Sequence, residues 1–314
     1  MDQSSAIADE FNQQFPNEQA CAAALCQARW PKGFRCPACD SPRFYILKTR
    51  RRPLFECASP RCRRQTSVTA GTIMEGSRTP LAKWLLAFRL LSQPGGISSV
   101  RLSRLLDVTY KTAWLISHKI RIAMQQEEES EQLQGFVRIE PFHYGLVYYM
   151  DALQPLVLGA AMDSQGNPTR VLMHQPHPSD VNDKSRKIKP DGIQSFVRNR
   201  VSEHAAVVHR SQESRTPQPL MTLKHAVGYW LNSTFHGIGA KHLQAYLNEF
   251  CFRQNASYRG HGSPFGLLLN WCATTRRQTY RTITRPRPVL TVPWITQGLT
   301  RNQWRGKHLT LLCS

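Results

Sequence analysis

Length, composition and charge place this chain among folded, strongly basic proteins. It has 314 residues, of which 41% are hydrophobic, so it is long enough for two or three domains with buried cores. A short peptide and a disulfide-rich miniprotein are excluded. The 41 Lys and Arg residues outnumber the 21 Asp and Glu residues, and the resulting net charge of +20 favours a polyanionic partner.

The positive charge is concentrated towards the end of the sequence. The 65 residues after Glu249 contain ten Lys or Arg and no acid. Such a segment repels itself unless it lies against a polyanion, so nucleic acid is the first partner to consider. The alternative is a solvated, partly disordered tail.

The sequence does not predict a membrane protein. The most apolar stretch, residues 81–91, is interrupted by Lys83 and Arg89 and is shorter than the roughly 18 apolar residues that span a bilayer. The first residues, MDQSSAIADEF, are acidic and lack the apolar core of a signal peptide. We therefore expect a cytoplasmic, nucleoid-associated protein whose cysteines serve a metal rather than disulfides.

Residues 1–30 are predicted to be a helical segment, and residues 31–72 carry the strongest motif. Cys36-Pro-Ala-Cys39 is followed, after 17 residues, by Cys57-Ala-Ser-Pro-Arg-Cys62. Four thiolates at this spacing suit tetrahedral Zn²⁺. With short strands predicted at 44–47 and 53–55, we expect a zinc ribbon too small to fold without its ion; the alternative is four unrelated thiols. Its basic loop supplies predicted phosphate contacts at Arg50, Arg51 and Arg52.

Residues 73–124 predict a helix-turn-helix. A helix starts at Thr79-Pro80 and ends before Pro94-Gly95-Gly96, Ser98 can cap a second helix, and a third begins at Tyr110 after a turn. In such a unit the early residues of the last helix enter the major groove, whereas a plain helical hairpin is the alternative. The predicted contacts to bases or backbone are Tyr110, Lys111 and Thr112, and those near phosphates are Arg101, Arg104, Lys119 and Arg121.

The rest of the chain divides into three parts. Residues 125–134, QQEEESEQLQ, are an acidic linker or a solvated helix end. Residues 135–255 are predicted to be a folded domain, with strands at 156–162 and 169–173 joined by a hairpin turn, and helices within 227–231 and 242–252. Residues 256–314 are predicted to be a basic extension.

Together these motifs resemble the ISXO-like insertion-sequence transposases over roughly residues 11–270. The resemblance implies a multidomain chain: a small zinc ribbon, a helical helix-turn-helix, an α/β RNase H-like domain and here a basic C-terminal extension. It also implies double-stranded DNA at mobile-element ends as partner, and a possible homo-oligomer. The residues that carry it are Arg29-Trp30-Pro31, Gly33-Phe34, the cysteine pairs, 65–72, Pro80-Leu81, Lys83-Trp84, 111–114, Trp230-Leu231, 234–237, 241–244, Tyr246-Leu247 and Glu249-Phe250.

In that family, DNA cleavage uses two divalent metals, such as Mg²⁺, held by converging carboxylates. The resemblance places the first ligand at Glu140, the second at Arg210 or its neighbour Ser211, and the third at Ala226. At most one of three expected ligands is kept, and an Arg at the centre would repel cations. A rearranged site is the alternative, built from some of Asp151, Asp163, Asp180, Asp183, Asp191 and Glu213.

Three hypotheses follow. The first is a transposase-family protein that uses structural Zn²⁺, recognises element ends and has lost strand cleavage. The second is an active, Mg²⁺-dependent transposase with a rearranged carboxylate site. The third is a zinc-dependent regulatory module that binds RNA or another protein.

Overall fold

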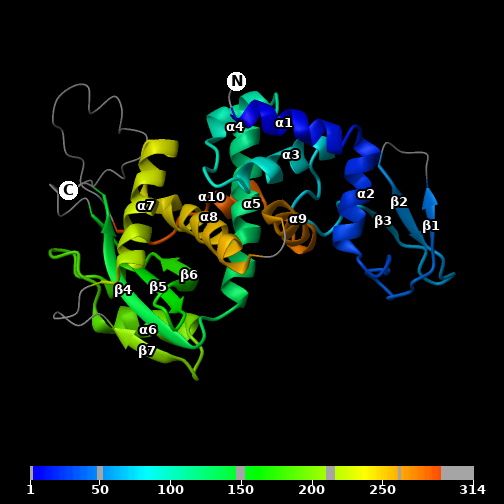
Figure 1. Cartoon of the computed structure of the whole chain (residues 1–314). Coiled ribbons are helices and arrows are strands. Elements are labelled where there is room, and N and C mark those ends of the chain that lie inside the picture. Colours follow the sequence, from blue (N-terminus) through cyan, green and yellow to red (C-terminus); the bar gives the residue numbers. More distant parts are fainter. Residues whose placement is uncertain (1–2, 48–51, 146–152, 210–215, 261–262, 291–314) are drawn as a thin grey trace. The chain divides into compact units, whose positions relative to one another are not determined.

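The structure is a computed structural model that describes residues 3–47, 52–145, 153–209, 216–260 and 263–290 (Figure 1). It has two compact units. Unit 1 comprises the described residues of Met1–Met124 and Gly262–Thr284, and unit 2 those of Gln125–His261 and Arg285–Ser314. The first segment of unit 2 therefore lies, in sequence, between the two segments of unit 1.

Unit 1 begins with two helices and a small sheet. The helices are α1 (Gln3–Gln14) and α2 (Glu18–Arg29), and the Asn17 side chain caps α2 by accepting a hydrogen bond from the Ala20 N–H. The antiparallel strands β1 (Phe44–Leu47), β2 (Leu54–Cys57) and β3 (Gln65–Ser67) follow in the order β1-β2-β3. The two predicted strands are confirmed; β3 was not predicted, because three residues are too few to show an alternating pattern.

The helices α3 (Leu81–Leu91), α4 (Ser99–Leu105) and α5 (Tyr110–Ser130) begin where the sequence predicts. The Ser98 side chain accepts a hydrogen bond from the Arg101 N–H and caps α4. In the turn before α5, Asp107 has a positive φ of 47°, and its carbonyl accepts a 2.7 Å hydrogen bond from Lys83 of α3. Since α5 continues to Ser130, the first part of the acidic segment is helical.

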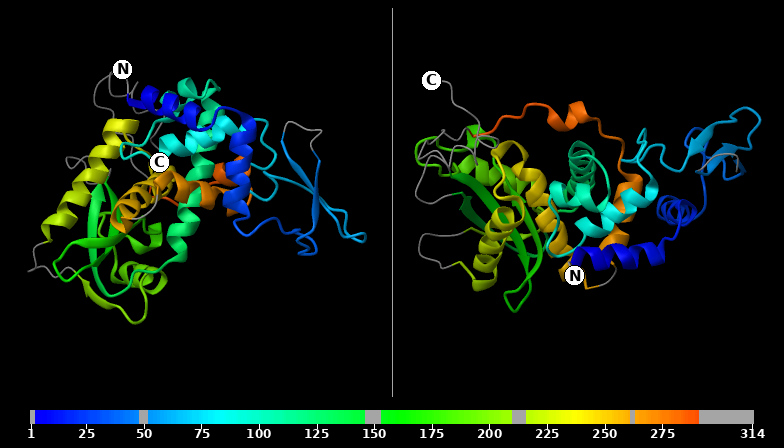
Figure 2. Two further views of the ribbon diagram at one scale, coloured as in Figure 1. Left: turned by 45° about the vertical axis from the view of Figure 1, so that its right-hand side comes forward. Right: turned by 90° about the horizontal axis from the view of Figure 1, so that it is seen from above.

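The last described elements return to unit 1 (Figure 2). They are α9 (Pro264–Thr274), which packs beside α2 and α3, and the short α10 (Tyr280–Thr284). The apolar face of α9 buries Phe265, Leu268, Leu269 and Cys272. This part of the predicted basic extension is thus an integral piece of unit 1.

Unit 2 is built on a mixed sheet of the strands β4 (Phe136–Tyr144), β5 (Gln154–Met162), β6 (Pro168–His174) and β7 (Ala206–His209). Their order is β6-β5-β4-β7; β4, β5 and β6 are antiparallel neighbours and β7 runs parallel to β4. The predicted hairpin between β5 and β6 is confirmed, and Asp163 Oδ1 accepts hydrogen bonds from the Gln165 and Asn167 N–H groups in its turn. The parallel pair requires a crossover, which contains η2 (Pro178–Asp180) and α6 (Pro190–Arg200).

Helices cover both faces of this sheet. One apolar core joins β5 and β6 to α7 (Gln218–Phe235) and α8 (Ala240–Arg259), and the other joins β4 and β5 to α6 (Figure 1). Every residue of β5 is consequently buried, as in a sheet with no solvated face. At Gly159 a Cβ would lie 2.7 Å from the Phe196 ring, so only glycine lets α6 pack this closely.

None of the helices in the described parts of the chain combines the length and apolarity needed to cross a bilayer.

Candidate metal centre, carboxylate site and nucleic-acid surface

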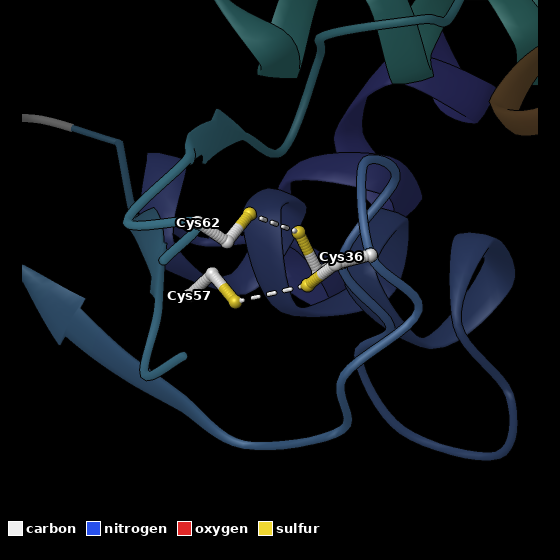
Figure 3. A group of neighbouring side chains, drawn as sticks. Cys36, Cys57 and Cys62 are labelled. Carbon is white, nitrogen blue, oxygen red and sulfur yellow. Dashed lines mark hydrogen bonds between the residues drawn. The ribbon is translucent and has the colours of Figure 1, made fainter. Parts of the chain in front are cut away.

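Four cysteine sulfurs converge at one end of the ribbon, defined as the segment from Phe34 to Ser67. The Sγ atoms of Cys36, Cys39, Cys57 and Cys62 all lie within 4.8 Å of one another. The Cys36 and Cys62 sulfurs are 3.6 Å apart, and those of Cys39 and Cys57 are 3.5 Å apart. Figure 3 shows the labelled sulfurs turned towards a common centre. Zn–S bonds of about 2.3 Å place tetrahedral ligands roughly 3.8 Å apart, so this set fits Zn²⁺.

Two tight turns hold the ligands. In the first, the Asp40 N–H donates to the Cys36 carbonyl and the Cys36 N–H donates to the Ser41 carbonyl. In the second, the N–H groups of Cys62 and Arg63 both donate to the Ser59 carbonyl. Arg63 has a positive φ of 48°, and this turn accommodates the four residues between Cys57 and Cys62.

The environment of Cys36 favours its thiolate. Burial opposes ionisation, but hydrogen bonds from the backbone N–H groups of Ala38 and Cys39 and contacts with the neighbouring thiols lower the Cys36 pKa to about 7. A thiolate is the form that binds zinc.

Among the described residues, the other cysteines do not belong to this group of four ligands. Burial raises the pKa of Cys251 in α8 and of Cys272 in α9, so both remain neutral and serve packing. Cys313 lies outside the described residues.

Glu140, the predicted first magnesium ligand, is completely buried on β4. Its Oε2 accepts a 2.9 Å hydrogen bond from Lys224 Nζ and a 2.8 Å hydrogen bond from Thr216 Oγ1. Arg138 Nη2 lies 3.4 Å from its Oε1. Burial raises the pKa of Glu140, but the hydrogen bonds from Lys224 and Thr216 outweigh this and lower it. The carboxylate is therefore ionised and already paired with two cationic side chains.

Lys224 reaches this site from α7, two residues before the predicted third ligand position. Its side chain is only 8% exposed. Ala226 itself packs against the apolar core of α7 and α8. The contact between Lys224 and Glu140 was not predicted from the sequence, where the available signal was a lysine two positions before the missing third acid.

The remaining acids do not form a metal site in the described parts of the chain. There, the four cysteines are the one group of three or more His, Cys, Asp or Glu side chains whose ligand atoms converge. The Asp163 carboxylate accepts backbone hydrogen bonds in its hairpin turn, and the Asp180 carboxylate accepts a hydrogen bond from the Ser179 hydroxyl. Arg210, Ser211, Asp151 and Glu213 lie outside the described residues.

The predicted DNA contacts of the helices separate into exposed and buried residues. Tyr110 is 53% exposed at the start of α5, Lys111 is exposed beside it, and Thr112 is half-buried. Arg101 and Arg104 of α4 are also exposed. Lys119 and Arg121, in contrast, are buried on the inner side of α5, and Lys119 donates to the Ile73 carbonyl. These two side chains are not available to phosphates in this conformation, because they lie on the packed face of the helix.

Arg52, a predicted phosphate contact, is instead engaged in contacts within unit 1. Its Nε lies 3.1 Å from Glu18 Oε1, and its Nη2 donates to the Thr79 carbonyl. Glu18 in turn accepts hydrogen bonds from the Leu81 and Ala82 N–H groups at the start of α3. Arg52 therefore ties the ribbon to α2 and α3. Arg50 and Arg51 lie outside the described residues.

Comparison with known families identifies the ribbon. Residues 16–65 match a family model described as a transposase zinc-ribbon domain, of the IS1595 type. No curated protein and no solved structure matches the chain. The matched segment contains all four clustered cysteines, so residues 16–65 form a transposase zinc-ribbon domain whose cysteines could hold a zinc ion.

Proposed function

We propose that this chain is a transposase-family protein that binds duplex DNA at mobile-element ends through unit 1, and that unit 2 is an RNase H-like scaffold without strand-cleavage chemistry. The observation that carries this proposal is the ion pair of Glu140 with Lys224, at the place where the family resemblance puts a magnesium ion. The transposase zinc ribbon supports the family assignment.

The topology of unit 2 supports the RNase H-like assignment. Its sheet has three antiparallel strands, followed in the chain by a helix and by a fourth strand that runs parallel to the first. This arrangement, in the order β6-β5-β4-β7, agrees with that fold. Glu140 lies on the first strand, where the family has its first aspartate.

The charges around Glu140 argue against two bound Mg²⁺ ions. Mg²⁺ needs an octahedral set of oxygens, and a two-metal site needs several carboxylates to balance four positive charges. Here one carboxylate faces the Lys224 ammonium at 2.9 Å and the Arg138 guanidinium at 3.4 Å. A cation entering this site would displace or repel both groups.

The exposed start of α5 supports DNA binding. It follows a short turn after α4, as in a helix-turn-helix, and presents Tyr110 and Lys111 to solvent. In such a unit these side chains contact base edges, while exposed arginines such as Arg104 contact phosphates.

Strand cleavage is tested with a supercoiled plasmid that carries the terminal repeats flanking the gene of this chain. We expect the zinc-loaded protein to bind the plasmid and leave it intact in Mg²⁺ or Mn²⁺. Nicking by the wild type that disappears in Glu140→Ala would contradict the proposed loss of cleavage.

DNA recognition is tested by fluorescence anisotropy with a duplex of the same repeats and a random duplex. The binding constant should fall steeply with salt, because phosphate contacts release counterions. Lys111→Ala should reduce the preference for the repeat duplex more than Arg51→Ala does, since a residue at a base edge carries specificity. Equal effects of both variants would count against α5 as the recognition helix.

A second candidate function is binding of single-stranded nucleic acid by the ribbon. Phe44, Tyr45 and Ile46 are 36%, 57% and 47% exposed on the edge strand β1, and exposed aromatic rings next to basic residues can stack on bases. Phe55, in contrast, is buried in the ribbon core against Phe34. Tighter binding of an unrelated single-stranded RNA than of duplex DNA, at matched salt, would favour this candidate.

A further inference from the structure

Residues 276–284, here called the C-terminal arm, lie beside the start of α5 although they are more than 150 positions away in sequence. The Tyr280 ring of α10 lies edge-on to the Trp114 ring of α5, with centroids 6.2 Å apart. Trp114 is one helical turn after Tyr110, the first residue of α5. The arm therefore borders the part of α5 that the proposed function assigns to DNA.

The position of the arm is fixed by buried contacts. It follows α9, whose apolar face packs beside α2 and α3, and Ile283 of the arm is buried as well. The Arg277 guanidinium lies over the loop before α3, since a Cβ on Gly76 would be 3.3 Å from its Cζ. These contacts hold the arm as a part of unit 1.

The exposed surface of the arm is basic. Arg276, Arg277 and Arg281 are exposed, and no acid follows Glu249 in the sequence. Tyr280 is 63% exposed in spite of its contact with Trp114. Trp114 is half-buried, and the tilted ring of His118 packs against it with ring centroids 4.0 Å apart. Trp114 thus packs against the ring of Tyr280. The groups of the arm that face solvent are Tyr280 and the arginines.

We propose that the C-terminal arm is a second part of the DNA-binding surface, in which Arg276 and Arg281 contact backbone phosphates of a duplex whose major groove receives the start of α5. This inference rests on the proposed function. Arginine is suited to this role because its guanidinium donates two parallel hydrogen bonds to a phosphate. Phosphate contacts fix the position of the duplex but carry no sequence information.

The proposal makes DNA binding depend on residues from both ends of unit 1. The helix α4 and the start of α5 precede the first segment of unit 2 in the sequence, whereas the arm follows that segment. A chain that ended with the first segment of unit 2, at His261, would retain the predicted recognition helix and lose the arm.

The test compares full-length, zinc-loaded proteins by fluorescence anisotropy on the terminal-repeat duplex and on a random duplex, over a range of salt concentrations. The double variant Arg276→Ala/Arg281→Ala removes two exposed charges of the arm. The matched control, Arg198→Ala/Lys241→Ala, removes two exposed charges from α6 and α8 of unit 2.

For the arm variant we expect the slope of log K against log salt to become shallower by about 2, because each phosphate contact contributes about 0.9 to that slope. Binding should weaken by a similar factor on both duplexes. Tyr280→Phe should retain wild-type binding, because the ring contact with Trp114 remains, whereas Tyr280→Ala should weaken it.

Two outcomes would overturn the proposal on the arm alone: a wild-type slope in the arm variant, or an equal change in the unit 2 control, which would indicate a net-charge effect. If the wild type itself fails to bind duplex DNA, the proposed function fails together with the arm. The wild-type measurement therefore separates the two failures.

Discussion

The cysteine cluster of the ribbon and the Glu140 site of unit 2 balance negative charge in different ways. In the ribbon, four sulfurs converge within 4.8 Å, and backbone hydrogen bonds favour the thiolate form of Cys36. In unit 2, one buried carboxylate faces Lys224, Arg138 and Thr216. The first arrangement needs a dication to bring its ligands together, whereas the second contains its counter-charges.

This difference predicts two kinds of stability. A zinc ion contributes its binding free energy directly to the folding of a small domain whose ligands are scattered in the unfolded chain. A buried ion pair adds little net stability, but removal of one partner leaves an uncompensated charge in the interior. Unit 1 should therefore respond to chelation, and unit 2 to single substitutions at the ion pair.

The largest expected effect is that of Cys57→Ser on the ribbon. Structural zinc contributes about 10–16 kcal/mol in isolated zinc-finger peptides, and loss of one ligand should leave the ribbon unfolded. Elemental analysis should show the loss of one zinc per chain, and hydrogen exchange should show loss of amide protection in β1 and β2. Unit 2 should stay folded. Cys26→Ser, in α2 next to the ribbon, is the control and should retain its zinc; full zinc occupancy in Cys57→Ser would refute the four-cysteine site.

The next effect in size is that of Lys224→Ala on unit 2. With Glu140 left buried and without its main counter-charge, we expect a loss of about 3–5 kcal/mol in the free energy of unfolding, measured by urea denaturation. Glu140→Leu/Lys224→Met, which removes both charges, should recover most of this loss. Lys241→Ala, an exposed lysine on α8, should change stability by less than about 0.5 kcal/mol. Rescue of Lys224→Ala by Mg²⁺ would show instead that a metal can replace the ammonium.

The smallest effect is the pH dependence that Glu140 contributes. Its pKa in the folded protein lies below the ordinary value of 4.5. On acidification, the carboxyl group therefore takes up its proton at a higher pH in the unfolded chain than in the folded protein. The stability from this carboxylate is complete above pH 4.5 and is lost as pH falls through the lowered pKa. The advantage of the wild type over Glu140→Gln should therefore be constant near neutral pH and shrink in acid. An advantage that grows below pH 4.5 would contradict the direction of the shift.

The sequence predicted the ribbon well because the ligands of each cysteine pair are close neighbours in the chain. Each cysteine pair lies within one turn, so spacing alone brings two ligands together, and the strands at 44–47 and 54–57 complete the site. The starts of α3, α4 and α5 were predictable for the same reason, from Pro80, Ser98 and the turn at Asp107.

Long-range contacts were not predictable in this way. Glu140 and Lys224 are 84 positions apart, and their pairing depends on how α7 packs on the sheet. The return of α9 to unit 1 was missed because the charge of residues 256–314 dominated their interpretation, although 264–273 contains an apolar run that indicates a buried helix. The burial of Lys119 and Arg121 follows from the packing of α5, and a count of charged residues could not predict it either.

Calorimetric titration of the zinc-loaded, full-length protein with Mn²⁺ tests most directly the claim that Glu140 is paired with side chains and not with metal. We predict no binding heat beyond dilution, with one zinc per chain by elemental analysis before and after the titration. Binding of two Mn²⁺ ions that is abolished by Glu140→Ala would contradict the account.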